Sequence, residues 1–101
     1  MKHKGLVWTV GVPTGRNRRA DISTQTKMAL DSIDARLAQA GTDKTKILET
    51  TVFLTNMKEF KGFDSVFSAW LPNGSGASRA TVGVAALANN DKVEIKVTVA
   101  S

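Results

Sequence analysis

The sequence predicts a domain that mixes α and β structure, with two helices covering one face of a single sheet. Stretches rich in β-branched residues alternate with two stretches that repeat apolar residues at helical spacing, in the order β-α-β-α-β-β. Alternatively, the first strand of this order is replaced by a hairpin of two short strands. The 101 residues suffice for one core but not two, and no repeat or linker divides them, so residues 1–101 are expected to form one domain.

The first half of the chain contains the clearest strand and helix signals. Residues 6–12 predict a strand with so little alternation that both of its faces are expected to be buried. Residues 21–40 predict a helix, because their apolar residues recur at steps of three and four. Asp21 is the expected N-cap of this helix, and Gly41 is the residue expected to end it.

A second strand and helix are predicted in the middle of the chain. Residues 50–55 have high β propensity. Asn56 is expected to cap the following helix, with Glu59 at the third position of a capping box. The apolar stripe of this helix consists of Phe60, Phe63, Phe67, Trp70 and Leu71. Residues 72–76, which include a proline and two glycines, end it.

The last two strands, at residues 78–84 and 92–99, carry the candidate site. Alternation places Arg79 and Thr81 on one face of the first strand, and Glu94 on the polar face of the second. Turn-forming residues 89–91 predict an antiparallel hairpin between them. If their apolar sets share one core, Arg79 and Glu94 share the opposite surface. A guanidinium there can hold a carboxylate ligand, and a carboxylate can orient water.

The two-sided apolar strands also predict self-association. Two helices can cover only one face of a sheet, yet the strands at residues 6–12 and 50–55 are apolar on both faces. Other copies of the same chain would cover the second face, so we expect a homo-oligomer.

Composition narrows the possible chemistry. The chain has no cysteine and one histidine, His3, which excludes disulfides, thiolate chemistry and a zinc site built from histidines and cysteines within one chain. We expect neither a metal nor a cofactor. No stretch approaches the apolar length of a membrane span, and the N-terminus lacks the core of a signal peptide, so we expect a cytoplasmic protein without a membrane partner.

A net charge of +5 favours anionic ligands, and part of it is local. Arg16, Arg18 and Arg19 fall within four residues. This arginine patch could bind the phosphates of RNA. No RNA-binding motif surrounds this patch, so a solvated loop is the favoured interpretation and a nucleic-acid partner is not expected.

A resemblance to the RidA/YjgF family of reactive-intermediate deaminases, and to its shorter RidA-like members, is carried by an ordered set of segments. These are Thr9-Val10-Gly11, the helix ending at Ala40-Gly41, Ile47-Leu48-Glu49-Thr50-Thr51-Val52-Phe53-Leu54, Ser78-Arg79-Ala80-Thr81-Val82 and Lys92-Val93-Glu94-Ile95. The resemblance implies a chorismate-mutase-like α+β fold with a mixed β-sheet, and a homotrimer around a central β-barrel. It also implies hydrolysis of enamine/imine acids, such as 2-aminoacrylate and its imine tautomer, to a 2-keto acid and ammonia in clefts between subunits.

The resemblance implies roles for five residues. Arg79 would pair with the substrate carboxylate, and Glu94 would position the attacking water. Gly11 would lie on the wall of the cleft. Thr81 stands where many members have cysteine, and Asp64 where many have asparagine, so both would lie at the substrate.

Two other functions stay open at this point. The chain has no tyrosine to supply the aromatic hydroxyl that lines the cleft in well-studied members of the family. Together with the extra charge of Asp64, this favours as an alternative a protein that binds a small carboxylate without converting it. A second alternative is an RNA-binding or ribonuclease-like protein that uses the arginine patch.

Overall fold

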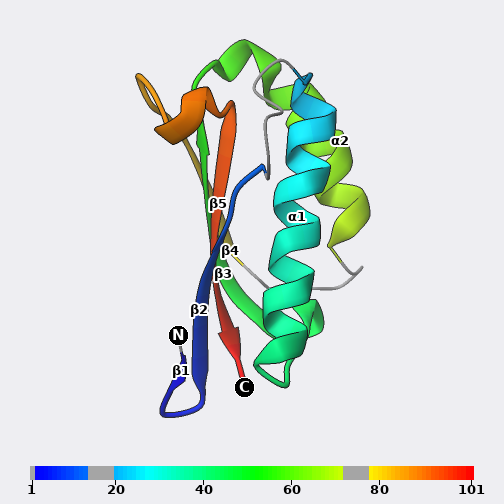
Figure 1. Ribbon diagram of the computed structural model, residues 1–101, viewed down its shortest axis with the longest axis vertical. Coiled ribbons are helices and arrows are strands. Elements are labelled where there is room, and N and C mark those ends of the chain that lie inside the picture. The colour runs from blue at the N-terminus through cyan, green and yellow to red at the C-terminus, as the bar shows by residue number, and fades with distance from the viewer. Residues whose placement is uncertain (1, 14–19, 72–77) are drawn as a thin grey trace.

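The computed structural model describes residues 2–13, 20–71 and 78–101, in which one five-stranded sheet carries two α-helices on one face (Figure 1). The strands are β1 (Lys2–His3), β2 (Leu6–Gly11), β3 (Ile47–Leu54), β4 (Ser78–Gly83) and β5 (Val93–Ala100), and the helices are α1 (Ile22–Gln39) and α2 (Phe60–Trp70). The predicted α+β class, with a mixed sheet and both helices on one face, is confirmed. The hairpin at the start of the chain is also found, because β1 pairs antiparallel with β2.

The order of the sheet is β1-β2-β5-β3-β4, and it corrects one prediction. The strand that carries Arg79 does not form a hairpin with the strand that carries Glu94, because β3 lies between them. β4 pairs parallel with β3, and α2 is the crossover that joins the two, whereas β5 pairs antiparallel with both β2 and β3. A helical crossover returns the chain to the end at which the previous strand began, so it favours a parallel neighbour.

The first helix agrees closely with the prediction. α1 begins after Asp21, whose carboxylate accepts a hydrogen bond of 2.8 Å from the backbone N–H of Thr24. It ends before Gly41, whose backbone has the left-handed φ of 78° that suits glycine at this place. The predicted apolar face is buried against the sheet, and Gln25 is buried with it. The Gln25 side chain accepts a 2.8 Å hydrogen bond from the backbone N–H of Lys92, which ties α1 to the start of β5.

The middle strand and helix differ from the prediction only at their ends. β3 begins at Ile47, three residues earlier than predicted, since Ile47 is buried and paired across a bulge with Val99. Asn56 is a cap, as predicted, but it caps a turn of 3₁₀ helix at Met57–Glu59, and its side chain accepts from the backbone N–H of Lys58. The α-helix α2 follows directly after this turn.

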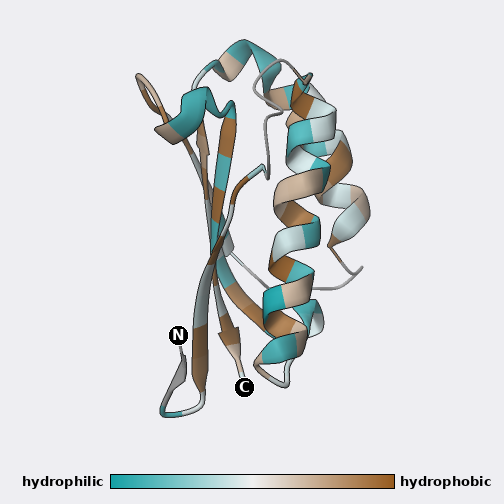
Figure 2. Cartoon of the chain, in the orientation of Figure 1, coloured by the Kyte–Doolittle hydropathy of each residue, from teal (hydrophilic) through white to brown (hydrophobic). Residues whose placement is uncertain are grey.

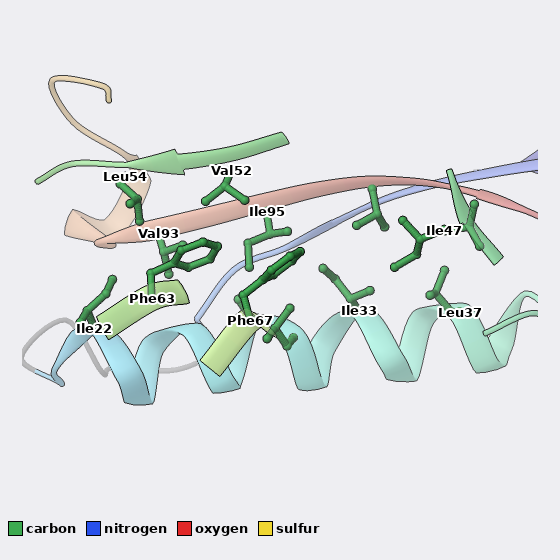
Figure 3. Packing of buried hydrophobic residues seen from close by; sticks show 14 of the residues in the cluster. Ile22, Ile33, Leu37, Ile47, Val52, Leu54, Phe63, Phe67, Val93 and Ile95 are labelled. Carbon is green, nitrogen blue, oxygen red and sulfur yellow. The ribbon is translucent and has the colours of Figure 1, made fainter. Parts of the chain in front are cut away.

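The core lies between the helices and the side of the sheet that faces them. Figure 3 shows Ile33 and Leu37 of α1 pointing towards the sheet, while Val52 and Ile95 lie across from the helical layer. Along β5, hydrophobic and hydrophilic residues alternate (Figure 2), as expected for a strand with one face in a core. Within the described ranges, no helix combines the length and the hydrophobicity that a bilayer crossing requires.

Among the described residues, no helix covers the other face of the sheet, and this face is partly apolar. Trp8 and Val10 of β2 alternate with the buried residues Val7 and Gly11, so they lie on this face. Val82 of the edge strand β4 lies on the same face, and this residue is 44% exposed. For β2, the arrangement agrees with the prediction that this strand carries apolar residues on both sides.

One acidic residue at the end of the sheet predicts a dependence of stability on pH. Asp91 is only 8% exposed, and its carboxylate has no hydrogen bond or ion pair within the part of the chain that the structure describes. Burial raises the pKa of Asp91 above its ordinary value of 3.8. The folded state therefore holds this proton more readily than the unfolded chain. The contribution of Asp91 to stability is present below pH 3.8 and is lost as the pH rises through the raised pKa.

We therefore expect Asp91→Asn to raise the free energy of unfolding at neutral pH by up to about 1 kcal/mol, because the amide carries no charge to bury. Well below the ordinary pKa the variant and the parent should be equally stable, since the carboxyl is then protonated in both states. Urea unfolding at the two pH values measures the difference. An equal gain at both would show that charge burial is not the cause.

Candidate functional site

Arg79 lies on the helix-facing side of the edge strand β4, against α2. Its Nη1 atom donates a 2.6 Å hydrogen bond, which is also an ion pair, to Oδ1 of Asp64. The guanidinium carbon lies 5.4, 6.0 and 5.3 Å from the ring centroids of Phe60, Phe63 and Phe67. The side chain of Arg79 is 30% exposed, so the rings fix the guanidinium while part of it remains open to solvent.

Within the described residues, only one oxygen of the Asp64 carboxylate accepts hydrogen bonds. Besides the bond from Arg79, its Oδ1 accepts a 3.3 Å hydrogen bond from the hydroxyl of Ser68, one helical turn later. Within the described ranges, no hydrogen bond engages its Oδ2, nor the Nε and Nη2 atoms of Arg79. The side chains of Arg79 and Asp64 are 30% and 36% exposed, so each group is partly open to solvent.

Glu94 does not share a face with Arg79, so that prediction is wrong for a single chain. In β5, Glu94 alternates with the fully buried Val93 and Ile95, and it therefore lies on the face away from the helices. Arg79 pairs across the strands with Thr50, which is buried on the helix side of β3. The apolar residues of β4 thus line the open face, and its arginine faces α2, the reverse of the predicted arrangement.

Thr81 and Gly11 are separated by the sheet order. Thr81 is half-buried, two residues along β4 from Arg79 and on the same side. Gly11 lies on β2, and β5 and β3 separate it from β4. It is buried beneath α1, where an added Cβ would meet the carbonyl oxygen of Ala29 at 2.3 Å. One chain therefore brings Arg79, Asp64 and Thr81 together, but neither Gly11 nor Glu94.

The phenylalanine rings around Arg79 are the part of the site that sequence reasoning missed. The sequence predicts these residues only as the apolar stripe of the helix, and Phe63 and Phe67 are indeed buried. The available signal was the position of Asp64, four residues after Phe60 and three before Phe67. This spacing puts a carboxylate on the same side of α2 as the rings.

The possible metal ligands and the arginine patch also bear on the chemistry of the chain. Within the described residues, no group of three or more histidine, aspartate or glutamate side chains is placed to hold a metal ion. The arginine patch at Arg16, Arg18 and Arg19 lies outside the described residues.

Known proteins are similar to this chain in both sequence and fold. A family profile described as endoribonuclease L-PSP matches residues 1–101. The chain is 35% identical over 98 residues to the RutC family protein YoaB of Escherichia coli, across 97% of this chain and 84% of that protein. It is 31% identical to the chloroplastic Reactive Intermediate Deaminase A of Arabidopsis thaliana, across 95% of this chain and 54% of that protein.

Solved structures agree with the sequence relatives. A protein of the conserved Rid family from Yersinia pestis matches with a TM-score of 0.89 at 30% identity, over 99% of this chain and 83% of that one. A member of the YjgF family from Neisseria meningitidis matches with a TM-score of 0.85 at 30% identity, over 96% and 80% of the two chains. The fold, the family profile and the relatives together show that this chain belongs to the RidA/YjgF family.

Proposed function

We propose that this protein hydrolyses reactive enamine/imine acids of the 2-aminoacrylate/2-iminopropanoate type to a 2-keto acid and ammonia. The observation that carries the proposal is the guanidinium of Arg79, held against three rings with its Nε–Nη2 edge unengaged within the described ranges. Such an edge can form two parallel hydrogen bonds to a carboxylate and so fix the plane of a small organic acid. The similarity to a reactive intermediate deaminase supports the same assignment.

The reaction demands little more than positioning. The enamine first becomes its imine tautomer, whose C=N carbon is electrophilic. Once the imine nitrogen is protonated, water adds to this carbon and loses one proton to a base, which gives a neutral carbinolamine. The nitrogen then takes up a proton, the C–N bond breaks to release ammonia, and the hydroxyl loses its proton as the C=O bond of the keto acid forms. We assign the base, which also orients the water, to Glu94, and contacts with the bound acid to Thr81 and Gly11.

A homotrimer with a central β-barrel completes the proposal. Its support is the partly apolar open face of the sheet, which a second copy of the chain can cover. Within one chain, Arg79 and Glu94 lie on opposite faces, so the proposed site requires two copies of the chain. One supplies Arg79, and its neighbour supplies Glu94. In a ring of identical chains, every interface between neighbours then contains one such site.

The first test measures turnover of an imine generated in solution. We expect the protein to accelerate the decay of 2-aminoacrylate over buffer, and Glu94→Gln to slow the catalysed rate by about 100-fold, because the amide cannot accept the proton. Glu49→Gln is the matched control, since Glu49 lies on β3 and is exposed. Equal rates for the Glu94 variant and the parent would remove Glu94 from the mechanism. No acceleration by the parent for several imino acids would remove the proposed reaction.

A second test asks whether the site is shared between copies. Arg79→Ala and Glu94→Gln chains are unfolded together and refolded as a mixture. If each site combines residues of two chains, about a quarter of the sites regain both wild-type residues, and activity returns. If both residues act from one chain, every site lacks one of them, and the mixture stays as inactive as its components.

A protein that binds a carboxylate without converting it is the second candidate. The observation that favours it is Asp64, whose carboxylate already occupies Nη1 of Arg79. Calorimetric binding of a 2-keto acid that Arg79→Ala abolishes, together with no acceleration of imine decay, would select this function.

A further inference from the structure

Asp91 is a buried carboxylate that lies beside a small pocket. The residue is 8% exposed, and no hydrogen bond or ion pair engages it within the described ranges. A charge buried in this way is costly unless an opposite charge or hydrogen-bond donors compensate it. The pocket next to the residue has a volume of about 180 Å³. We call it the Asp91 pocket, and its lining residues are Thr55, Ala85, Ala86, Leu87, Asn90 and Asp91.

The Asp91 pocket lies at the end of the sheet where β4 ends and β5 begins (Figure 1). β4 ends at Gly83, and a short 3₁₀ turn at Ala88–Asn90 leads to Asp91. Arg79 stands four residues before the end of β4, and a strand rises about 3.3 Å per residue, so about 13 Å of strand separate Arg79 from this end. The pocket is therefore distinct from the candidate site around Arg79.

The carboxylate of Asp91 keeps a small opening to solvent. Among the described residues, the fully enclosed side-chain oxygens without a hydrogen-bond partner belong to Thr26 and Thr50, not to Asp91. Since the Asp91 oxygens also lack a partner there, they retain some exposed surface, and the space next to the residue is the pocket. The adjacent cation is engaged elsewhere, because Nζ of Lys92 donates a 2.8 Å hydrogen bond to the carbonyl oxygen of Ala20.

The lining of the pocket combines one negative group with an apolar wall. Ala85, Ala86 and Leu87 supply the wall, and Asp91 is the titratable residue of the lining. A divalent metal ion requires several oxygen ligands, and within the described residues no three acidic or histidine side chains gather to hold one. A primary alkylammonium ion fits the lining better, because its N–H groups can donate to a single carboxylate while its short chain covers the wall.

We propose that the Asp91 pocket binds small primary amines in their protonated form. The charged nitrogen of the ligand donates to the carboxylate of Asp91, and the alkyl chain packs on Leu87 and the two alanines. The ligand thus brings the positive charge that the described residues do not supply. This inference goes beyond the proposed function and does not depend on it, since neither Arg79 nor Glu94 lines the pocket.

Titration of the full chain with propylammonium chloride, followed through the backbone amide signals in NMR spectra, tests the proposal. The largest shifts are expected at residues 84–92. Asp91→Asn should weaken binding by about tenfold or more, because the neutral amide does not attract the cation. Asp31→Asn removes an exposed carboxylate on α1 and should bind propylammonium as the parent does. Ammonium chloride should bind about tenfold more weakly than propylammonium, since ammonium has no chain to cover the wall.

Binding should also follow the ionisation of Asp91. Burial raises the pKa of Asp91 above 3.8, whereas an alkylammonium ion stays charged to far higher pH, so the affinity should fall as the pH is lowered through the raised pKa. The inference fails if the parent does not bind propylammonium, if Asp91→Asn binds it equally well, or if the affinity does not change with pH. It also fails if potassium chloride causes the same shifts, which would show a response to salt alone.

Discussion

Replacing Arg79 with alanine is expected to lower the rate of imine hydrolysis by about 100-fold or more, because two charge-assisted hydrogen bonds to the substrate carboxylate are lost. Without these hydrogen bonds, the C=N carbon of the substrate has no fixed position relative to the attacking water. Imine decay followed in the presence of each variant measures the effect.

The fold should survive this substitution. The Arg79 side chain is 30% exposed, and its ion pair with Asp64 and its ring contacts are each expected to contribute about 1 kcal/mol or less. Sedimentation should therefore give the same assembly as the parent chain. An alanine variant that keeps full activity would refute the role of Arg79.

Arg79→Lys refines the test, because an ammonium keeps the charge but cannot form two parallel hydrogen bonds in one plane. We expect it to recover only part of the rate. Lys27→Ala, which removes an exposed cation on α1, should leave the rate unchanged. Full activity in the lysine variant would show that a positive charge alone suffices and that the two parallel hydrogen bonds of the guanidinium are not required.

Gly11→Ala is expected to lower the free energy of unfolding by about 3 kcal/mol, the upper part of the range for overpacked cores. An ideal Cβ at this position would lie 2.3 Å from the carbonyl oxygen of Ala29 and 2.6 Å from Cγ1 of Ile33. The carbonyl belongs to the backbone of α1 and cannot move alone, so the whole helix must shift away from β2. Urea unfolding at equal protein concentration measures the loss.

Gly83→Ala is the matched control on β4. Among the described residues, its Cβ would meet the Met57 side chain and no backbone atom, at 3.0 Å from Cγ. Met57 is flexible and 46% exposed, so it can turn aside, and we expect a change below about 1 kcal/mol. If the two glycine variants lose equal stability, the close approach of α1 to Gly11 is not what requires glycine there.

The sequence was most informative where burial is decided locally. The helix at α1 was predicted to within one residue at each end, because its cap, its 3.6-residue apolar period and its terminal glycine all lie within the segment itself. The alternation of Val93, Ile95 and Val97 likewise identified the buried face of β5. Membership in the family also followed from short segments in a fixed order.

Partners across the sheet could not be predicted in the same way. Alternation shows which residues share a face of one strand, but it does not show which strands are neighbours. The turn residues before β5 suggested a hairpin with β4, whereas the crossover through α2 placed β4 beside β3. β4 and β5 follow each other closely in the sequence, but this does not show that β3 lies between them in the sheet.

The amino-acid sequence by itself determined the elements, the core face of α1 and the candidate residues, because each depends on neighbours within a few positions. Only the tertiary structure decided which way Arg79 faces. Both sides of the edge strand β4 are partly exposed, so no hydrophobic pattern distinguished them, and Val82 looked like a core residue. Arg79 faces the helices because α2 supplies the aromatic rings that its guanidinium covers and, in Asp64, the carboxylate that pairs with it.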